Sequence, residues 1–266
     1  MRFWNYIIMN NSILKFGKLS TLTVATLSVL ALNACATQNQ SVMDDGVVIS
    51  DPLEDTNRAV FKFNEVVDDN IIHPAIKGYR FVVPKEVRNS LGNFLRNLRS
   101  PVIFANQVLQ GDIEGAGNVL LRTAINTFTG FGGLFDFAAK EGMPHESEDF
   151  GQTLATWGLD NGPYLVVPLL GPSTARDSVG YIVDAYADPL RWYLFDSGQE
   201  HLSYQRTGLN YLNVRDNLMD VLEDLRRSSI DYYASTRSIY YQRRDALIRD
   251  ENPDDAVAVS IPDYDE

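Results

Sequence analysis

The only cysteine of this 266-residue chain, Cys35, directly follows an apolar run, and this arrangement constrains the fold most. The run covers residues 19–32 and carries no charge, and Lys15 and Lys18 precede it. A basic segment, a short apolar run and a small residue before the cut are typical of a secretory signal. A membrane-spanning helix needs about 20 apolar residues, so this run is too short to be one. The sequence therefore predicts a signal peptide over residues 1–34 and a mature domain that folds without a disulfide.

Cys35 is also the predicted site of lipid attachment. The segment Leu32-Asn33-Ala34-Cys35 resembles the lipobox of bacterial lipoproteins, although Asn33 is larger and more polar than the usual residue. The alternative is a stray thiol after an ordinary signal, which would leave an unpaired cysteine in an oxidising compartment. Acylation explains the thiol and gives stable anchoring, because each buried CH₂ contributes about 0.8 kcal/mol.

The residue after the cysteine indicates which membrane receives the protein. In lipoproteins of Gram-negative bacteria, an Asp at this position usually retains the protein in the inner membrane. Ala36 occupies the position here. We therefore expect a lipid-anchored protein of the outer membrane with its polypeptide on the periplasmic face.

The charge of the chain excludes one class of partner. The net charge is -12, and removal of residues 1–34 takes away Arg2, Lys15 and Lys18 but no acid, which leaves -15. A basic footprint for nucleic acid is absent, so no nucleic-acid partner is expected. Anionic headgroups would not be attracted by net charge either, so any lipid contact must be mainly apolar.

Beyond the cysteine, the sequence divides into three parts. Residues 35–50 form the lipidated polar tether, and residues 51–250 form the domain. Residues 251–266 contain no basic residue and two prolines, which is typical of a disordered acidic tail.

The predicted fold class is all-α, with a single helical domain. Apolar residues recur at the three- and four-residue spacing of a helix face. The clearest stripes are Val87, Leu91, Phe94, Leu95 and Leu98; Ile113, Ala116, Leu120, Ala124 and Phe128; and Leu218, Val221, Leu222 and Leu225.

Several residues predict where helices begin and end. Asp55 or Thr56 caps the first helix, and a loop contains residues 73–74 and 83–84. Ser100-Pro101 ends one helix and starts the next, which Gly111 closes. Further helices cover 150–157, 174–188 and most of 201–250; Thr174 and Asp177 suit a capping box at the start of the second.

The run 164–170 is the one candidate strand of the domain. Pro168 lies within it, and a proline argues against a place inside a sheet. We find no convincing alternation of strands elsewhere and no internal repeat.

No motif predicts a catalytic residue, a metal site or a cofactor. The segment 171–175 superficially resembles a nucleophile elbow, which requires a strand, a helix and a downstream histidine. His201 is the only downstream histidine, the second glycine is missing, and helix capping already explains Ser173 and Thr174. His145 lies among acidic residues without a second imidazole, so we expect a polar loop rather than a metal site.

Ordered blocks of residues over about 50–248 carry a family resemblance. The first block comprises Asp51-Pro52-Leu53-Glu54, Asn57-Arg58, Phe61, Asn64, Tyr79, Val83-Pro84, Val87-Arg88, Asn93-Phe94, Asn97-Leu98, Pro101, Asn106 and Gln110-Gly111. The most specific block comprises Phe150-Gly151-Gln152-Thr153-Leu154, Trp157-Gly158, the run 162–173, Arg176-Asp177 and Gly180. In these residues the chain resembles the VacJ/MlaA lipoproteins.

The resemblance implies a fold and a function. The fold would be a ring-like monotopic membrane protein with an amphipathic channel. Such a protein would remove mislocalised phospholipid from the outer leaflet of the outer membrane, without a cofactor, and so maintain lipid asymmetry. Its partners would be phospholipid, an outer-membrane porin trimer and a soluble periplasmic lipid carrier. The alternative is a structural lipoprotein that stabilises a porin complex without conducting lipid.

The resemblance also implies candidate site residues. The family-motif positions that could shape the lipid path are Asn57, Arg58, Asn64, Gly130, Gly132, Gly133, Gly151, Gln152, Trp157, Pro168, Gly171 and Pro172. The glycine-rich segment 129–139 allows two interpretations. It is either a tight turn whose aromatic residues enter the core, or a flexible wall or hinge beside the lipid path.

Overall fold

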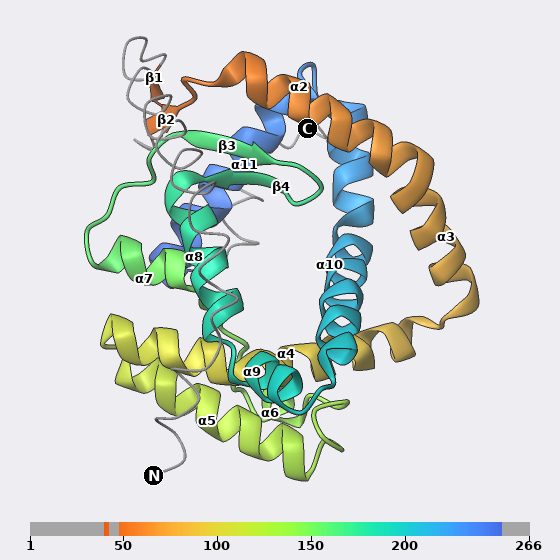
Figure 1. Ribbon diagram of the computed structural model, residues 1–266, viewed down its shortest axis with the longest axis vertical. Helices are drawn as coiled ribbons and strands as arrows, with labels where there is room; N and C mark the ends of the chain where they lie inside the picture. The colour runs from red at the N-terminus through yellow and green to blue at the C-terminus, as the bar shows by residue number, and fades with distance from the viewer. Residues whose placement is uncertain (1–39, 43–47, 252–266) are drawn as a thin grey trace, which may run out of the picture.

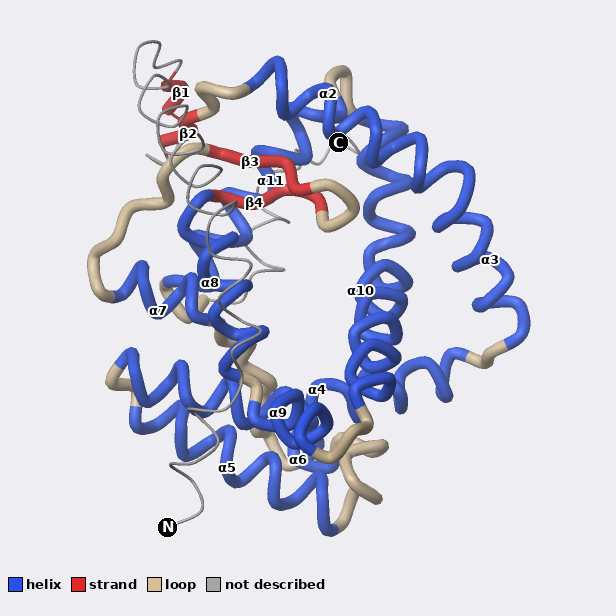
Figure 2. The backbone as a smooth tube through the Cα atoms, in the orientation of Figure 1, coloured by secondary structure: helices blue, strands red, loops and turns tan. Residues whose placement is uncertain are grey.

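The described residues, 40–42 and 48–251 in a computed structural model of the chain, are mainly helices arranged around a ring (Figure 1). Cys35 and nearly all of the acidic tail lie outside the described residues. Figure 2 shows that strands contribute only two small hairpins. In chain order the elements are β1 (Gln40–Val42), β2 (Val48–Ser50), α2 (Glu54–Val67), η3 (Asp68–Ile72), α3 (His73–Val82), α4 (Lys85–Gln110), α5 (Ile113–Phe128), α6 (Phe137–Lys140), α7 (Phe150–Thr156), β3 (Tyr164–Val167), β4 (Gly171–Thr174), α8 (Ala175–Ala187), α9 (Pro189–Asp196), α10 (Glu200–Ser228) and α11 (Tyr232–Ile248).

The chain follows the circumference of the ring before its later helices line the inner side. Helices α2 and α3 form one arc, and α4 with α5 forms the base (Figure 1). Helices α8 and α10 then stand on opposite sides of the interior, with α9 between them at the base. The prediction of an all-α, ring-like fold is confirmed.

Two predicted helix boundaries are wrong because prolines are accommodated within helices. Helix α4 continues through Pro101, which is exposed, so water can reach the carbonyl group that loses its helical partner. Pro74 was expected in a loop, but it lies in the first turn of α3, where the missing N–H costs nothing. A single π-helical turn, η3, joins α3 to α2.

Other helix ends agree with the sequence, except at the start of the domain. Gly111 closes α4 in the left-handed conformation, with φ of 85°. Thr174 caps α8 by accepting a hydrogen bond from the Asp177 amide at 3.2 Å. At the first helix, however, neither Asp55 nor Thr56 is the cap, because α2 begins at Glu54 and Leu53 precedes it without a side-chain cap.

The run 164–170 contributes to a β-hairpin that the prolines did not prevent. Strands β3 and β4 pair antiparallel, with Tyr164 opposite Thr174 and Val166 opposite Pro172. Each strand of a two-stranded sheet has one unpaired edge, which tolerates a proline. Pro168 lies beyond the end of β3, in the turn. Within the predicted tether, β1 and β2 also pair antiparallel, so that segment is not wholly irregular.

One cluster of buried apolar residues lies at the β3–β4 hairpin and comprises Tyr164, Val166, Tyr233 and Tyr241. Other buried apolar residues, such as Ile103 and Val119, lie on α4 and α5. The Tyr164 and Tyr233 rings meet edge to face, with centroids 6.2 Å apart. Because a ring of helices encloses little apolar volume, contacts of other kinds must help to hold the ring closed.

Ion pairs between distant elements supply much of that closure. Arg244 of α11 binds Asp149 before α7 at 2.6 Å and Asp177 of α8 at 2.9 Å. Burial alone would raise the pKa of Asp149, but the hydrogen bonds and charge of Arg244 lower it to about 2. On the other side of the ring, Arg215 of α10 binds Asp68 of the neighbouring η3 at 2.7 Å.

The outer surface carries an apolar face on α5. Ile113, Leu120, Leu121 and Phe128 are all exposed there, and Phe128 retains 87% of its exposed area. In the described part of the chain, no helix combines the length and the apolar character needed to cross a membrane.

Candidate functional site in the ring interior

The β3–β4 hairpin is held across the upper part of the ring by two predicted site residues of α2. Asn57 is buried; its amide nitrogen donates to the Tyr164 carbonyl at 2.9 Å and its oxygen accepts from the Val166 amide at 2.9 Å. Asn64 donates to the Val167 carbonyl at 3.0 Å and accepts from the Leu169 amide at 2.8 Å. Both residues therefore position the hairpin.

The tip of the hairpin also reaches the opposite side of the ring. The Tyr211 hydroxyl on α10 donates to the Leu169 carbonyl at 3.1 Å. Leu169 and Leu170 at this tip are both about half exposed, at 49% and 53%. The hairpin thus places two exposed leucines between the two sides of the ring.

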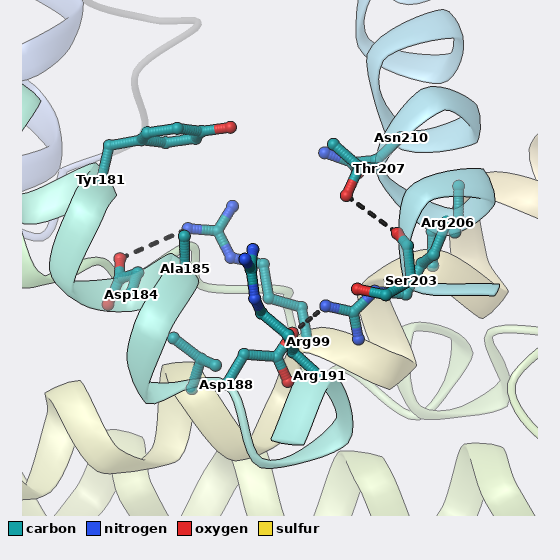
Figure 3. Close-up of a pocket in the computed structure, with 12 residues that line it drawn as sticks. Arg99, Tyr181, Asp184, Ala185, Asp188, Arg191, Ser203, Arg206, Thr207 and Asn210 are labelled. Atoms are coloured by element: carbon teal, nitrogen blue, oxygen red, sulfur yellow. Dashed lines mark hydrogen bonds and ion pairs between the residues drawn. The ribbon is translucent and has the colours of Figure 1, made fainter. Parts of the chain in front are cut away.

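A pocket of about 140 Å³ lies at the other end of the interior, between α8 and α10 (Figure 3). Leu95, Val102 and Tyr181 give it apolar surface, and Ser203 and Asn210 give it polar groups. Three arginines and two aspartates complete the polar lining: Arg99, Arg191, Arg206, Asp184 and Asp188. Side chains from α4, α8, α9 and α10 therefore form one amphipathic surface.

Asp184 is fixed at the edge of the pocket by neutral donors. Its carboxylate accepts from Asn106 Nδ2 at 3.0 Å and from the Phe150 amide at 3.1 Å. Arg99 lies farther away, at 3.8 Å. Burial raises the pKa of Asp184 above its usual value, although these donors oppose the shift.

The remaining predicted site residues belong to the scaffold, and none of them lines this pocket. Arg58 binds Asp231 at 2.7 Å and covers the Tyr233 ring at 4.3 Å from its centroid. Gly151 and Gly180 lie where α7 and α8 meet closely: a Cβ on Gly180 would lie 2.3 Å from the Gly151 nitrogen, and one on Gly151 would lie 2.5 Å from Arg244 Nη2.

Gln152 and Trp157 stabilise the chain around α7. The buried Gln152 amide donates to the Ser147 carbonyl at 2.8 Å. Trp157 is 56% exposed, and its indole nitrogen donates to the Leu109 carbonyl at 3.0 Å, which joins the end of α7 to α4.

The residues of the hairpin turn provide its shape. Pro168, Gly171 and Pro172 surround Leu169, whose φ is 65°. Gly171 has φ of 90°, a conformation that favours glycine. These residues thus determine the shape of the turn, and through it the position of Leu169 at the hairpin tip.

The glycine-rich segment forms a tight turn between α5 and α6. A Cβ on Gly130 would lie 2.3 Å from the Phe135 carbonyl oxygen, and one on Gly133 would lie 2.5 Å from the Asn97 Cβ. Gly132 and Gly133 have φ of 73° and 99°. The expectation that the aromatic residues enter the core is wrong for Phe131, which is 77% exposed.

Two residues considered for chemistry have structural surroundings. Ser173 does not cap α8, since that role belongs to Thr174; its hydroxyl lies 2.9 Å from the Ser178 hydroxyl. His145 lies in an irregular segment, as expected, and lines a small pocket with Arg96 and Arg122. Burial, with the charges of these arginines, lowers the pKa of His145 to about 4. In the described ranges, no group of three potential metal ligands is present.

No sequence pattern predicts the pocket arginines. Arg99, Arg191 and Arg206 lie on three different helices, so no spacing along the chain connects them. Asp188 was noted only as a helix end, where it does cap α9 by accepting from the Leu190 amide at 3.0 Å. Only the folded ring brings these residues together.

Comparison with known proteins gives consistent relatives over most of the chain. The sequence model described as MlaA lipoprotein matches residues 49–247. The intermembrane phospholipid transport system lipoprotein MlaA of Haemophilus influenzae is 34% identical over 237 residues, which cover 88% of this chain and 92% of the relative. The protein of the same name from Escherichia coli is 33% identical, with coverage of 86% and 88%.

A solved structure is similar as well. Its description reads "Structural basis for maintenance of bacterial outer membrane lipid asymmetry". It matches with a TM-score of 0.65 and 33% identity, and the match covers 75% of this chain and 99% of that chain.

Proposed function

The chain belongs to the MlaA lipoprotein family, and on this premise we propose that it transports phospholipid between membranes. In this proposal it removes mislocalised phospholipid from the outer leaflet of the outer membrane and hands it to a soluble periplasmic carrier. Lipid asymmetry is thereby maintained. The transfer needs no cofactor, because the lipid is moved and no covalent bond changes.

One observation carries the proposal beyond the family name. The pocket between α8 and α10 combines apolar side chains with charged and hydroxyl groups inside a ring of helices. A phospholipid has both kinds of surface, so an amphipathic interior suits it better than a purely apolar core would. The exposed Leu169 and Leu170 at the hairpin tip add apolar surface to the same interior.

The outer surface supports a position within one leaflet of the membrane. The exposed apolar face of α5 would lie in the acyl region, while the interior would remain open to lipid. A lipid on Cys35 would anchor the chain, with residues 35–50 as the tether and 51–250 as the functional domain. The surrounding partner in this arrangement would be a porin trimer.

A structural lipoprotein that only stabilises a porin complex is the alternative function. It would need the outer apolar face but not the pocket. Neither of the two proposed functions involves catalysis, and the Ser173 hydroxyl contacts the Ser178 hydroxyl.

The test is whether the pocket determines lipid binding. The full-length protein and an Ala185→Trp variant would be purified in detergent, and the bound lipid phosphorus would be measured per protein. Ala185 lines the pocket, so the indole should fill it and reduce bound phospholipid. Ala187→Trp is the matched control, because Ala187 is exposed on the same helix.

Transfer completes the test. Loaded wild-type protein should pass phospholipid to acceptor vesicles through a periplasmic carrier, and Ala185→Trp should do so poorly. Wild-type protein that retains no phospholipid, yet still binds its porin, would favour the structural alternative.

A further inference from the structure

Three arginines converge on the pocket between α8 and α10, although the chain as a whole is strongly acidic. Arg99 comes from α4, Arg191 from α9 and Arg206 from α10. Figure 3 shows them approaching the same space from these three helices. Guanidinium groups suit phosphate oxygens, because they present planar arrays of donors and remain charged.

The carboxylates of the pocket do not neutralise all three arginines. Asp188 pairs with Arg206, and Asp184 lies 3.8 Å from Arg99. Among the described residues, no carboxylate forms an ion pair with Arg191. Two carboxylates therefore face three guanidinium groups, which leaves one positive charge of the pocket without a negative counterpart.

Arg191 is held in place without an ionic partner. Its guanidinium carbon lies 5.4 Å from the centroid of the Tyr186 ring and 5.1 Å from that of Phe195. Aromatic contacts of this kind orient a guanidinium group while its N–H groups remain available. The guanidinium group of Arg191 thus lines the pocket and is available to a ligand.

Arg206 provides a second indication that an anion is missing. Its Nη1 atom is buried and has no hydrogen-bond partner in the structure. Burial lowers the pKa of Arg206, and the like charge of Arg99 lowers it further. An anion between Arg99 and Arg206 would relieve the repulsion between the two like charges.

Part of the pocket wall beside the arginines is apolar. Leu95 and Val102 are buried side chains of α4 at the pocket wall, and Tyr181 is exposed on α8. A ligand here would place an anion against the arginines and hydrocarbon against these residues. The site therefore fits an amphipathic monoanion better than a free inorganic ion.

We propose that Arg99, Arg191 and Arg206 bind the phosphodiester of a glycerophospholipid inside the ring. This proposal rests on the proposed function and specifies which residues hold the phosphate group of the lipid. Because the phosphodiester is common to these lipids, the site accepts different headgroups but excludes neutral lipids such as diacylglycerol.

The test compares Arg191→Gln with a matched arginine outside the pocket. Arg191 forms no ion pair with any residue that the structure describes, so its replacement should leave the melting temperature nearly unchanged. Loss of a charge-assisted hydrogen bond should weaken phospholipid binding about tenfold. Arg249→Gln is the control. Arg249 is exposed at the C-terminal end of α11, and it pairs with Asp245 of the same helix. Delipidated full-length proteins would be titrated with mixed micelles that contain phosphatidylglycerol or, separately, diacylglycerol.

A second variant protects the test from a folding defect. Arg99→Gln removes a side chain that is 45% exposed and only loosely paired, so it should fold and show a similar loss. Phosphatidylglycerol binding that stays at the wild-type level in both folded variants would overturn the headgroup site but leave lipid transport intact. Wild-type protein that binds no phospholipid would overturn the proposed function itself.

Inorganic phosphate separates a lipid site from an ion site. The headgroup assignment predicts that millimolar phosphate competes weakly with phosphatidylglycerol. If phosphate alone binds tightly by calorimetry, depends on Arg191, and leaves lipid binding unaffected, the pocket is an ion site and the proposal is wrong.

Discussion

Asn57 and Asn64 lie seven residues apart on one face of α2, and each binds the backbone of the β3–β4 hairpin through both ends of its amide group. Seven residues are about two helical turns, so the two side chains point the same way. Each amide supplies one donor and one acceptor, as a neighbouring strand would. Helix α2 therefore replaces a third strand along the free edge of β3.

This relationship predicts different costs for the two asparagines. Asn64→Ala removes two hydrogen bonds at the partly buried tip and should reduce the free energy of unfolding by about 1–2 kcal/mol. Asn57→Ala should cost more, because Asn57 is buried and also donates to Asp51 at 2.8 Å. Urea unfolding measures both values.

Hydrogen exchange gives the local readout. The Leu169 amide should exchange faster in Asn64→Ala, because it loses its acceptor. Thr56→Ala, on the exposed side of α2, should leave both exchange and stability unchanged. An unchanged Leu169 exchange rate in Asn64→Ala would show that the clamp does not hold the tip.

The sequence predicted helices well because a stripe of apolar residues identifies a buried face. It could not identify what each face packs against, which depends on pairs such as Arg215 with Asp68 and Arg244 with Asp149. The ring was therefore expected only from the family resemblance. The three pocket arginines were missed for the same reason, since they meet only in the closed ring.

The sequence indicates one strand of the hairpin, the run 164–170, but not its partner, because Gly171 and Pro172 are typical of a turn. Pro172 lies within β4 but in a two-stranded sheet, where each strand has a free edge. The spacing of Asn57 and Asn64 was the available signal, since polar side chains two turns apart on one helix face can satisfy an edge strand.

The cap of α8 leads to a second prediction. Thr174→Ala removes the hydroxyl that accepts from the Asp177 amide and should cost about 1 kcal/mol. Ser173→Ala should cost less, because the Ser173 hydroxyl caps no helix and bonds only to the Ser178 hydroxyl and, at 3.3 Å, to the Thr174 carbonyl. Thermal unfolding of both variants tests this order. Release of free fatty acid by the wild type, lost in Ser173→Ala, would instead establish an enzyme.

The buried Glu148 leads to a prediction about pH. Burial raises its pKa to about 7, with Asp250 and Asp149 contributing and the Gln110 hydrogen bond opposing. Between its ordinary value of 4.5 and about 7, the folded state keeps a proton that the unfolded state has released. Stability from this group is therefore present below pH 4.5 and is lost as the pH rises through 7.

Glu148→Gln should remove that dependence. At pH 8 the variant should be more stable than the wild type by about 1–3 kcal/mol, because no charge is buried. Near pH 4.5 the two proteins should be similar. Glu141→Gln is the control, since Glu141 is exposed. Denaturant unfolding at the two pH values gives the comparison, and a difference independent of pH would contradict the assignment.

Cys35 is the only thiol of the chain, so Cys35→Ala should abolish acylation and release the domain from stable anchoring. Labelled fatty acid followed by membrane fractionation measures both effects. The matched variant is Cys35→Ser, which keeps the size of the side chain but offers no thiol. Continued incorporation of label into either variant would show that another residue accepts the lipid.

The last prediction distinguishes the two interpretations of the glycine-rich segment, a packing turn and a hinge. Gly133 has φ of 99°, and a Cβ there would lie 2.5 Å from the Asn97 Cβ, so Gly133→Val is strained twice. At Gly132 the φ is 73° but nothing lies within 4 Å of the added Cβ, so Gly132→Ala meets only the backbone strain.

If the segment is a packing turn, Gly133→Val should lose about 2–4 kcal/mol and Gly132→Ala about 1 kcal/mol, with function falling in proportion to stability. If it is a hinge or wall beside the lipid path, both variants should fold and remain anchored, yet leak or block lipid. The melting temperature of each purified variant must therefore be compared with the lipid-asymmetry phenotype of cells that carry the same variant. Because Asn97 contacts both Thr127 and the Gly132 carbonyl, we expect the packing turn, and a well-folded Gly133→Val variant with defective asymmetry would overturn that expectation.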